Sequence, residues 1–155
     1  MPDSKPRPHK QAPRPRLLLV ANPAAQSGRN EERIAEARSL LDAAALDHDF
    51  LPTLREPGRT AAAIREALAA GPYRMLVAMG GDGTIADVAR GLLGAGKGRE
   101  LPLGLLPTGT ANDLGRSFGL SSDPGQLRRN VDVLAAGHET DLDAGLLTAF
   151  DAGGR

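Results

Sequence analysis

The chain has 155 residues, which is enough for one domain with a hydrophobic core and too few for two domains of ordinary size. Its 19 basic side chains balance its 19 acidic ones and only 3% of its residues are aromatic, so a general nucleic-acid-binding protein is excluded. The absence of cysteine excludes disulfides and thiolate metal sites and fits a cytoplasmic location, and no apolar run is long enough to span a membrane.

Residues 1–15 contain five prolines among several basic side chains, a composition that cannot form a packed element. This predicts a disordered, solvated tail, and the folded domain is expected over residues 16–155. The alternative interpretation is that the basic side chains are weakly attracted to anionic lipid head groups, which would bring the protein to the periphery of a membrane.

Two strands and two helices are predicted in the next part of the chain. The apolar run at 17–21 predicts a buried strand, and residues 22–28 form the loop that leaves it. Apolar residues at helical spacing predict a helix over 31–45, with acids in its first turn. A half-buried strand over 48–54 and a helix ending near Gly71 follow.

The stretch Gly80-Gly81-Asp82-Gly83-Thr84 joins an apolar strand at 73–79 to an amphipathic helix. Three glycines in four positions allow the backbone to approach a ligand closely, and a helix N-terminus presents free N–H groups and a positive dipole end. Thr84 is expected to cap this helix, with Asp87 reciprocating. The helix is expected to bury one stripe of residues: Ile85, Val88, Ala89, Leu92 and Leu93. A phosphate group fits such a cradle, although glycines also serve tight turns that bind nothing.

Asp82 points to a cation in the same place. A carboxylate among phosphate-facing amides is electrostatically unfavourable unless a cation neutralises it, and Mg²⁺ bridging to phosphate is the usual partner in phosphoryl transfer. The chain lacks the Lys-[Ser/Thr] ending of a P-loop, and this loop is not the Gly-x-Gly-x-x-Gly of dinucleotide sites.

A second glycine-containing turn repeats the arrangement. An apolar strand predicted at 101–106 ends in a loop in which Thr110 is followed three residues later by Asp113. Thr84 and Thr110 would then each offer a hydroxyl beside a helix N-terminus, and Asp113 either belongs to the site or caps the helix that follows. We therefore predict two phosphate-type loops.

The remaining elements are less regular. Short helices are predicted around Leu114 and Phe118 and from Pro124 onward, the second with Leu127, Val131, Leu134 and Ala135 on one face. Residues 138–147 alternate only loosely between polar and apolar. Asp141 and Asp143 are either catalytic acids or the ordinary polar positions of a strand.

Strands that alternate with helices and are joined by short loops predict an α/β fold, with an open, mostly parallel, Rossmann-like sheet covered by helices on both faces. Ligands of such sheets bind at the carboxyl ends of the strands. Both glycine-threonine loops, Thr53 and the loop at 22–28 follow predicted strands, so we expect all four segments at one edge.

Three segments occur in the order seen in a known family: Asn-Pro…Ser-Gly at 22–28, Gly-Gly-Asp-Gly-Thr-Ile-Ala-Asp-Val at 80–88 and Pro-Thr-Gly-Thr-Ala-Asn-Asp-Leu-Gly-Arg at 107–116. Together they resemble the catalytic domain of diacylglycerol kinases and related lipid kinases. The resemblance implies the N-terminal nucleotide-binding fold shared by these enzymes and NAD kinases. It also implies an ATP- and Mg²⁺-dependent kinase that transfers the γ-phosphate to a hydroxyl of a diacylglycerol-like lipid at the membrane surface.

The resemblance further implies which residues contact the nucleotide, with Asp82 as the metal ligand and the catalytic residue. The implied contacts are Asn22, Ser27, Gly28, Thr53, Gly80, Gly81, Asp82, Gly83, Thr84, Ile85, Ala86, Gly109, Thr110 and Asn112.

Two features depart from the family pattern. The family commonly has Asn-Glu where this chain has Ala86-Asp87. Family members also carry a C-terminal, mostly β domain that supplies the general base and much of the lipid cleft, and this chain is expected to end where that domain begins. The uncovered surface would then favour a homo-oligomer. The alternatives to a lipid kinase are a non-catalytic or truncated ATP-binding module and an NAD kinase, although NAD kinases lack the third segment.

Overall fold

The computed structural model describes residues 15–25 and 29–145. Ser27 and Gly28 lie outside the described residues, as does the predicted tail except for Pro15. The elements are, in chain order, β1 (Arg16–Ala21), α1 (Arg29–Ala43), β2 (His48–Pro52), α2 (Arg59–Ala70), β3 (Tyr73–Gly80), α3 (Asp82–Gly94), β4 (Leu103–Pro107), α4 (Asp113–Ser117), the 3-10 turn η2 (Pro124–Gln126) and α5 (Leu127–Ala136).

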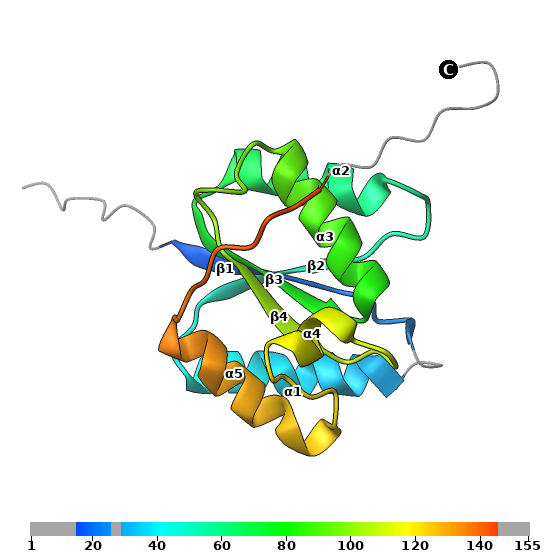
Figure 1. Ribbon diagram of the computed structural model, residues 1–155, viewed down its shortest axis with the longest axis vertical. Coiled ribbons are helices and arrows are strands. Elements are labelled where there is room, and N and C mark those ends of the chain that lie inside the picture. The colour runs from blue at the N-terminus through cyan, green and yellow to red at the C-terminus, as the bar shows by residue number, and fades with distance from the viewer. Residues whose placement is uncertain (1–14, 26–28, 146–155) are drawn as a thin grey trace, which may run out of the picture.

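The four strands form one parallel sheet in the order β2-β1-β3-β4, which confirms the predicted α/β fold. In the middle of the sheet, Leu18 of β1 lies between Asp49 of β2 and Leu76 of β3. The chain moves to one side of β1 to form β2 and then crosses back to form β3. Because crossovers between parallel strands are right-handed, these opposite moves place α1 on one face and α2 on the other, as Figure 1 shows.

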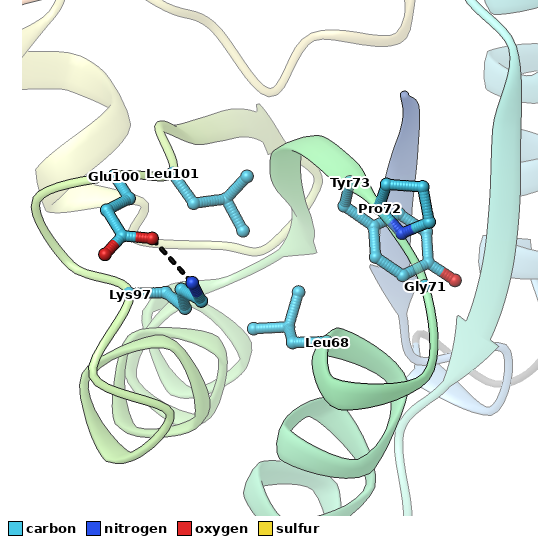
Figure 2. Close-up of a pocket in the computed structure, with 7 residues that line it drawn as sticks. All are labelled: Leu68, Gly71, Pro72, Tyr73, Lys97, Glu100 and Leu101. Atoms are coloured by element: carbon cyan, nitrogen blue, oxygen red, sulfur yellow. Dashed lines mark hydrogen bonds and ion pairs between the residues drawn. The ribbon is translucent and has the colours of Figure 1, made fainter. Parts of the chain in front are cut away.

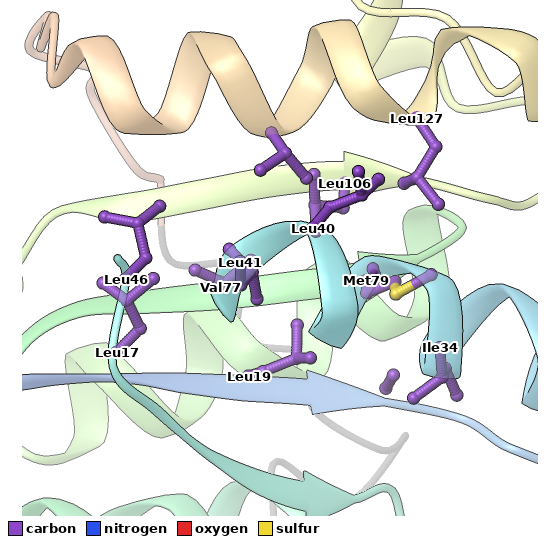
Figure 3. Packing of buried hydrophobic residues seen from close by; sticks show 13 residues of the cluster. Leu17, Leu19, Ile34, Leu40, Leu41, Leu46, Val77, Met79, Leu106 and Leu127 are labelled. Carbon is purple, nitrogen blue, oxygen red and sulfur yellow. The ribbon is translucent and has the colours of Figure 1, made fainter. Parts of the chain in front are cut away.

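The first face of the sheet packs against α1 and α5 (Figure 1). Alternate residues of β1 point to this face, because successive side chains of a strand point to opposite sides. Figure 3 shows this core, in which sheet, α1 and α5 contribute Leu17, Leu19, Ala21, Ile34, Ala37, Leu40, Leu41, Val77, Met79, Leu106, Leu127 and Val131. The α5 helix approaches β4 closely at Gly104, where a methyl group would lie 2.7 Å from Leu134.

The second face packs against α2 and α3. Its core consists of Leu18, Val20, Ile64, Leu76, Ala78, Ile85, Val88, Leu92, Leu101 and Leu105. The two helices approach each other at Gly91, where a methyl group would lie 2.8 Å from Ile64. Each large apolar side chain buried in these two layers contributes roughly 1.5–3 kcal/mol, so the ends of the strands are held by a sheet that is packed on both sides.

One sequence prediction about the fold is wrong, and the strand considered for residues 138–147 is absent from the part of that segment that the structure describes. Leu93 is 53% exposed, because consecutive helical residues are turned by about 100° and Leu93 is therefore carried away from the stripe that contains Leu92. Residues 138–145 form no strand and are all exposed. Their loose alternation offers too little apolar surface to hold a strand on the sheet, and Leu142 is itself 64% exposed.

Candidate functional site

The carboxyl ends of all four strands meet at one edge of the sheet, because the strands are parallel. The strand order reverses between β1 and β3, and the loop after β1 leads to α1 on one face while the loop after β3 leads to α3 on the other. The carboxyl ends of the strands at such a point of divergence are where α/β proteins commonly bind ligands. Asn22, Thr53, Gly81 and Gly109 each follow a strand within two residues and therefore lie at this edge.

The α3 helix begins at Asp82, two residues earlier than the predicted cap. Its N-cap is Gly81, whose carbonyl oxygen accepts the first hydrogen bond of the helix at 3.1 Å. Thr84 is thus the third helical residue, and Asp87 pairs with Arg90 at 2.8 Å. The predicted Thr84 cap is wrong, because the extended backbone of Gly81 leads the chain into the helix without any side-chain cap.

Gly80 is explained by packing within the chain. A methyl group at Gly80 would lie 2.5 Å from Oγ1 of Thr84, so the threonine side chain lies directly over the Gly80 backbone. This glycine is therefore required by the fold itself and is not a sign of a ligand.

Gly83 has no comparable explanation within the described residues. Apart from its chain neighbours and the nearby backbone of its own helix, no atom of the described residues lies within 4 Å of a methyl group built at Gly83, and the residue is exposed in the first turn of α3. Glycine is roughly 1 kcal/mol less favourable than alanine in a helix, so the residue lowers the stability of α3. Asp82 beside it is also exposed. This helix N-terminus is open to an approaching group, and its N–H groups and dipole favour an anion.

The loop between β4 and α4 is held together by Asn112, whose side chain is 1% exposed. Its Oδ1 accepts a hydrogen bond from the Gly109 N–H at 3.0 Å, and its Nδ2 donates to the Gly109 carbonyl oxygen. Its backbone is left-handed, with φ 53°, a conformation that asparagine adopts more readily than most residues. The Asn112 amide is thus turned into the loop and holds its shape.

Thr110 lies exposed in this loop, before the N-cap residue Asn112 of α4. The prediction that Thr84 and Thr110 hold equivalent positions at their helices is therefore wrong. Thr84 lies inside α3, whereas Thr110 lies before α4. Asp113 is the first residue of α4 and not its cap. The difference arises because the second loop closes on a left-handed asparagine and the first passes straight into its helix.

The two loops meet backbone to backbone at Gly81 and Gly109. A methyl group at Gly109 would lie 2.5 Å from Cα and 3.0 Å from N of Gly81. The loops are also joined where the Thr108 N–H donates to the Gly80 carbonyl oxygen at 3.0 Å. They form one continuous surface, so the position of the second loop limits the position of the first.

A hollow of about 250 Å³ opens at the same edge, beside the ends of β1 and β2. It is lined by Asn22, Pro23, Ala24, Pro52, Thr53, Leu54 and Arg55. The Thr53 N–H donates to the Ala21 carbonyl oxygen at 2.8 Å, and Oδ1 of Asn22 accepts from the Ala24 N–H at 3.0 Å. The structure thus brings Asn22 and Thr53 together around one space.

The predicted contacts Ile85 and Ala86 are less accessible. The Ile85 side chain is 4% exposed and belongs to the core beneath α3. Ala86 is half-buried one position further along the helix. The Ile85 side chain is therefore unavailable to a ligand.

Two polar residues of α1 that sequence reasoning missed hold the loops at this edge. Asn30 is fully buried, and its Nδ2 donates to the carbonyl oxygen of Asn22 at 2.6 Å. Arg33 donates through its two terminal nitrogens to the carbonyl oxygens of Thr108, at 3.4 Å, and Ser122, at 2.9 Å. Asn30 and Arg33 each lie four residues before a buried apolar residue of α1 and therefore on the same face of the helix. Two polar residues on an apolar face were the sequence signal that could have identified them.

Burial lowers the pKa of Arg33, and the carboxylates of Glu36 and Asp123 oppose that shift. The guanidinium group remains protonated across the ordinary pH range, because the unperturbed pKa of arginine lies so far above neutrality. It is thus a permanent, half-buried cation behind the second loop.

A second hollow, of about 160 Å³, lies at the opposite edge of the sheet (Figure 2). It is lined by Leu68, Gly71, Pro72, Tyr73, Lys97, Glu100 and Leu101. Its ammonium and carboxylate groups neutralise each other, since Lys97 Nζ lies 2.5 Å from Glu100 Oε2. None of the predicted site residues lines this hollow. The carboxyl edge, where the predicted residues lie, is therefore the better candidate for the functional site.

Over residues 15–25 and 29–145, no group of three or more histidine, aspartate or glutamate side chains could by itself hold a metal ion. In the same part of the chain, no helix has the length and apolar character needed to cross a membrane.

Comparison with known proteins gives a consistent result. A sequence model described as the diacylglycerol kinase catalytic domain matches residues 16–147. The chain is 30% identical over 132 residues to a diacylglycerol kinase of Staphylococcus aureus (strain bovine RF122 / ET3-1). The matched segment covers 85% of this chain and 40% of that protein. It is 41% identical over 87 residues to a protein named probable lipid kinase YegS-like of Pseudomonas fluorescens (strain Pf0-1), covering 56% of this chain and 27% of that protein.

The fold is also similar to a solved structure of a diacylglycerol kinase from Bacillus anthracis str. Sterne. The TM-score is 0.63 and the identity 26%, over 79% of this chain and 40% of that one. The chain spans less than half the length of each of these relatives.

Proposed function

This chain belongs to the family of diacylglycerol kinase catalytic domains, and we propose that it binds ATP at the carboxyl edge of its sheet as the nucleotide-binding part of a lipid kinase. The proposed reaction of the whole protein is transfer of the ATP γ-phosphate to a hydroxyl of a diacylglycerol-like lipid at a membrane surface. The family membership supports the kinase class, and the geometry of the edge supports the place of the nucleotide.

The observation that carries this proposal is the open space at Gly83. The chain keeps a helix-weakening glycine where its own packing leaves room for a side chain. A phosphate that approaches the backbone would explain why residue 83 is glycine, because a methyl group there would stand between the phosphate and the N–H groups of the first turn. Those N–H groups have no partner within the helix and are free to donate.

We assign the other contacts from their places around this point. Gly81 and Gly109 present backbone on the same surface, and the exposed Thr110 offers a hydroxyl to the phosphates. The hollow that contains Asn22 and Thr53 would receive another part of the nucleotide. The family resemblance adds Ser27 and Gly28 to this set.

Asp82 is proposed as the ligand of Mg²⁺ or of its waters. The donor set fits, because Mg²⁺ in phosphoryl-transfer sites is commonly held by one or two carboxylates and completed by phosphate oxygens and water. Asp82 supplies one exposed carboxylate at the start of α3. When bound, Mg²⁺ neutralises charge on the phosphates.

The residues of this chain would act mainly by positioning. The first turn of α3 holds and orients the terminal phosphates, and the paired loops keep that turn in place, so that the acceptor hydroxyl can attack in line with the departing oxygen. Asp141 and Asp143 lie exposed in an irregular segment, and neither is proposed as the general base.

The proposal is tested by isothermal titration of the chain with ATP and Mg²⁺, together with transfer of radiolabelled phosphate to diacylglycerol in vesicles. Binding with transfer is the expected result for a complete kinase. Binding without transfer identifies this chain as a nucleotide-binding module, and absence of binding contradicts the proposal. An assay for NADP formation tests the NAD kinase alternative, and we expect none.

A further inference from the structure

We infer that Arg33 is a positioning residue that sets the geometry of the phosphate-binding surface by holding the β4–α4 loop, without contacting the nucleotide itself. This inference rests on the proposed function. It goes beyond that proposal because it assigns a role to a side chain outside all three sequence motifs.

The first two turns of α1 contact both the loop after β1 and the loop after β4. Asn30 holds the residue that follows β1, through its hydrogen bond to the Asn22 carbonyl oxygen. Arg33, almost one turn later, holds the residue that follows β4, through its hydrogen bond to the Thr108 carbonyl oxygen. One rigid helix therefore fixes two loops whose strands are not neighbours in the sheet.

The effect of Arg33 can be followed through the backbone. Thr108 is bonded on its carbonyl side to Arg33 and on its N–H side to Gly80, and the next residue, Gly109, lies against Gly81. A loop that moves away from Arg33 would lose this contact with Gly81. The first turn of α3, which we propose to bind phosphate, begins at the very next residue.

The guanidinium group is poorly suited to a purely stabilising role. Its Nε is buried without a hydrogen-bond partner among the described residues, and its pKa is lowered by burial. A half-buried cation with an unpaired donor is less favourable than an apolar side chain of similar size. Its two terminal nitrogens nevertheless reach two separate carbonyl oxygens, of Thr108 and Ser122, which a lysine ammonium on a flexible stem reproduces only in part.

The test compares the full 155-residue chain with Arg33→Met, Arg33→Lys and the control Arg128→Met. Arg128 is an exposed residue of α5 without a hydrogen bond or ion pair to the described residues. Binding of ATP and of adenosine, each with Mg²⁺, is measured by displacement of a fluorescent ATP analogue, and thermal unfolding is recorded for every variant. Hydrogen exchange at the amides of Gly109 and Asn112 reports the loop directly.

We expect Arg33→Met to weaken ATP binding by about tenfold or more while leaving adenosine within about twofold of the wild type. The ATP affinity of Arg33→Lys should lie between those of Arg33→Met and the wild type, and the affinity of Arg128→Met should match the wild type. Amide exchange at Gly109 should be faster in Arg33→Met than in the wild type. If Arg33→Met does not fold, the intermediate affinity of Arg33→Lys carries the test.

Three results would overturn the inference and leave the proposed function standing. These are wild-type ATP affinity in a folded Arg33→Met chain, equal weakening of ATP and adenosine, and complete rescue by Arg33→Lys, which would reduce the role of Arg33 to its charge. Failure of the wild type to bind ATP overturns the proposed function first, and the inference falls with it.

Discussion

Gly81 and Gly109 lie so close across the carboxyl edge of the sheet that a methyl group on Gly109 would be 2.5 Å from the Cα of Gly81. The obstacle is backbone, which cannot rotate aside as a side chain can. The two phosphate-type loops therefore behave as one unit, and the requirement for glycine is strongest at Gly109, since a methyl group at Gly81 would lie 3.3 Å from the Cα of Gly109.

Gly109→Ala should destabilise the fold by about 1–3 kcal/mol, because the added methyl group must push the two loops apart. Urea unfolding measures the change. Gly125→Ala is the matched control, since a methyl group there meets only Asp123 Oδ1 at an ordinary 3.5 Å. Equal stability of the two variants would contradict the close approach.

Gly83→Ala should separate stability from binding. The protein should unfold at the same or a slightly higher denaturant concentration, since alanine favours the helix by up to about 1 kcal/mol and meets no atom of the described residues. Its affinity for ATP should nevertheless fall by about tenfold or more, because the methyl group would stand where a phosphate approaches. Titration calorimetry of a stable variant with unchanged affinity would refute the assignment of the phosphate site.

Asp82→Asn should remove the magnesium dependence of ATP binding. The exposed carboxylate has no hydrogen bond or ion pair to the described residues, so the fold should be unaffected. Wild-type affinity for ATP should rise by about tenfold when Mg²⁺ is added, and that rise should be lost in the amide variant. Titrations with and without Mg²⁺ make the comparison, and an undiminished rise in Asp82→Asn would place the metal elsewhere.

Asn112 combines a left-handed backbone with two hydrogen bonds to Gly109. Asn112→Gly keeps the backbone conformation and loses the bonds, and should be destabilised by about 1–3 kcal/mol. Asn112→Ala should be less stable again, by about 1–2 kcal/mol, because alanine is strained at this φ. Denaturant unfolding of both variants gives the order, and a more stable alanine variant would rule out the strain.

Ionisation of Tyr73 is expected to lower the stability of the folded protein at alkaline pH. Burial, the hydrogen bond to Asp49 at 2.9 Å and the charge of that carboxylate raise the pKa of Tyr73, and Arg16 opposes the shift. The unfolded chain therefore loses this proton first, at about pH 10, and the tyrosine's contribution to stability, present below that pH, is lost as pH rises through the raised folded value. Tyr73→Phe should show a flatter decline of stability above about pH 10.

Tyr73 is the single tyrosine of the chain, so its ultraviolet absorbance follows this ionisation without interference. The folded protein should ionise at a higher pH than the urea-unfolded protein. Coincident titration curves would show that the contact with Asp49 does not hold in solution.

The layers of the fold could be predicted from local patterns. Apolar runs marked β1, β3 and β4, a half-buried pattern marked β2, and helical spacing marked the face of α1 that contains Ile34 and Leu41. Most ends of the predicted elements moved by a residue or two. The N-cap of α3 moved by three residues, from Thr84 to Gly81, because an extended glycine can begin a helix without a capping side chain.

The relationships between distant segments could not be predicted. The three glycines of the first loop look alike in sequence, yet Gly80 accommodates Thr84, Gly81 meets Gly109 and Gly83 faces open space. Arg33 contacts a carbonyl oxygen 75 residues away, and its own neighbourhood contains no sign of that partner. Such contacts depend on how the sheet brings loops together, which a local pattern does not encode.

The position of α5 has a consequence for the order in which the protein can mature on the ribosome. The layer of α1 on the sheet is completed by Leu127 and Val131, which follow β4, the last strand of residues 15–25 and 29–145. A nascent chain that has released only β1 to β4 would still expose Leu106 and its neighbours on that face, and transiently exposed apolar surface of this kind is prone to aggregation. Release of α5 is therefore the step at which this apolar face of the sheet becomes covered.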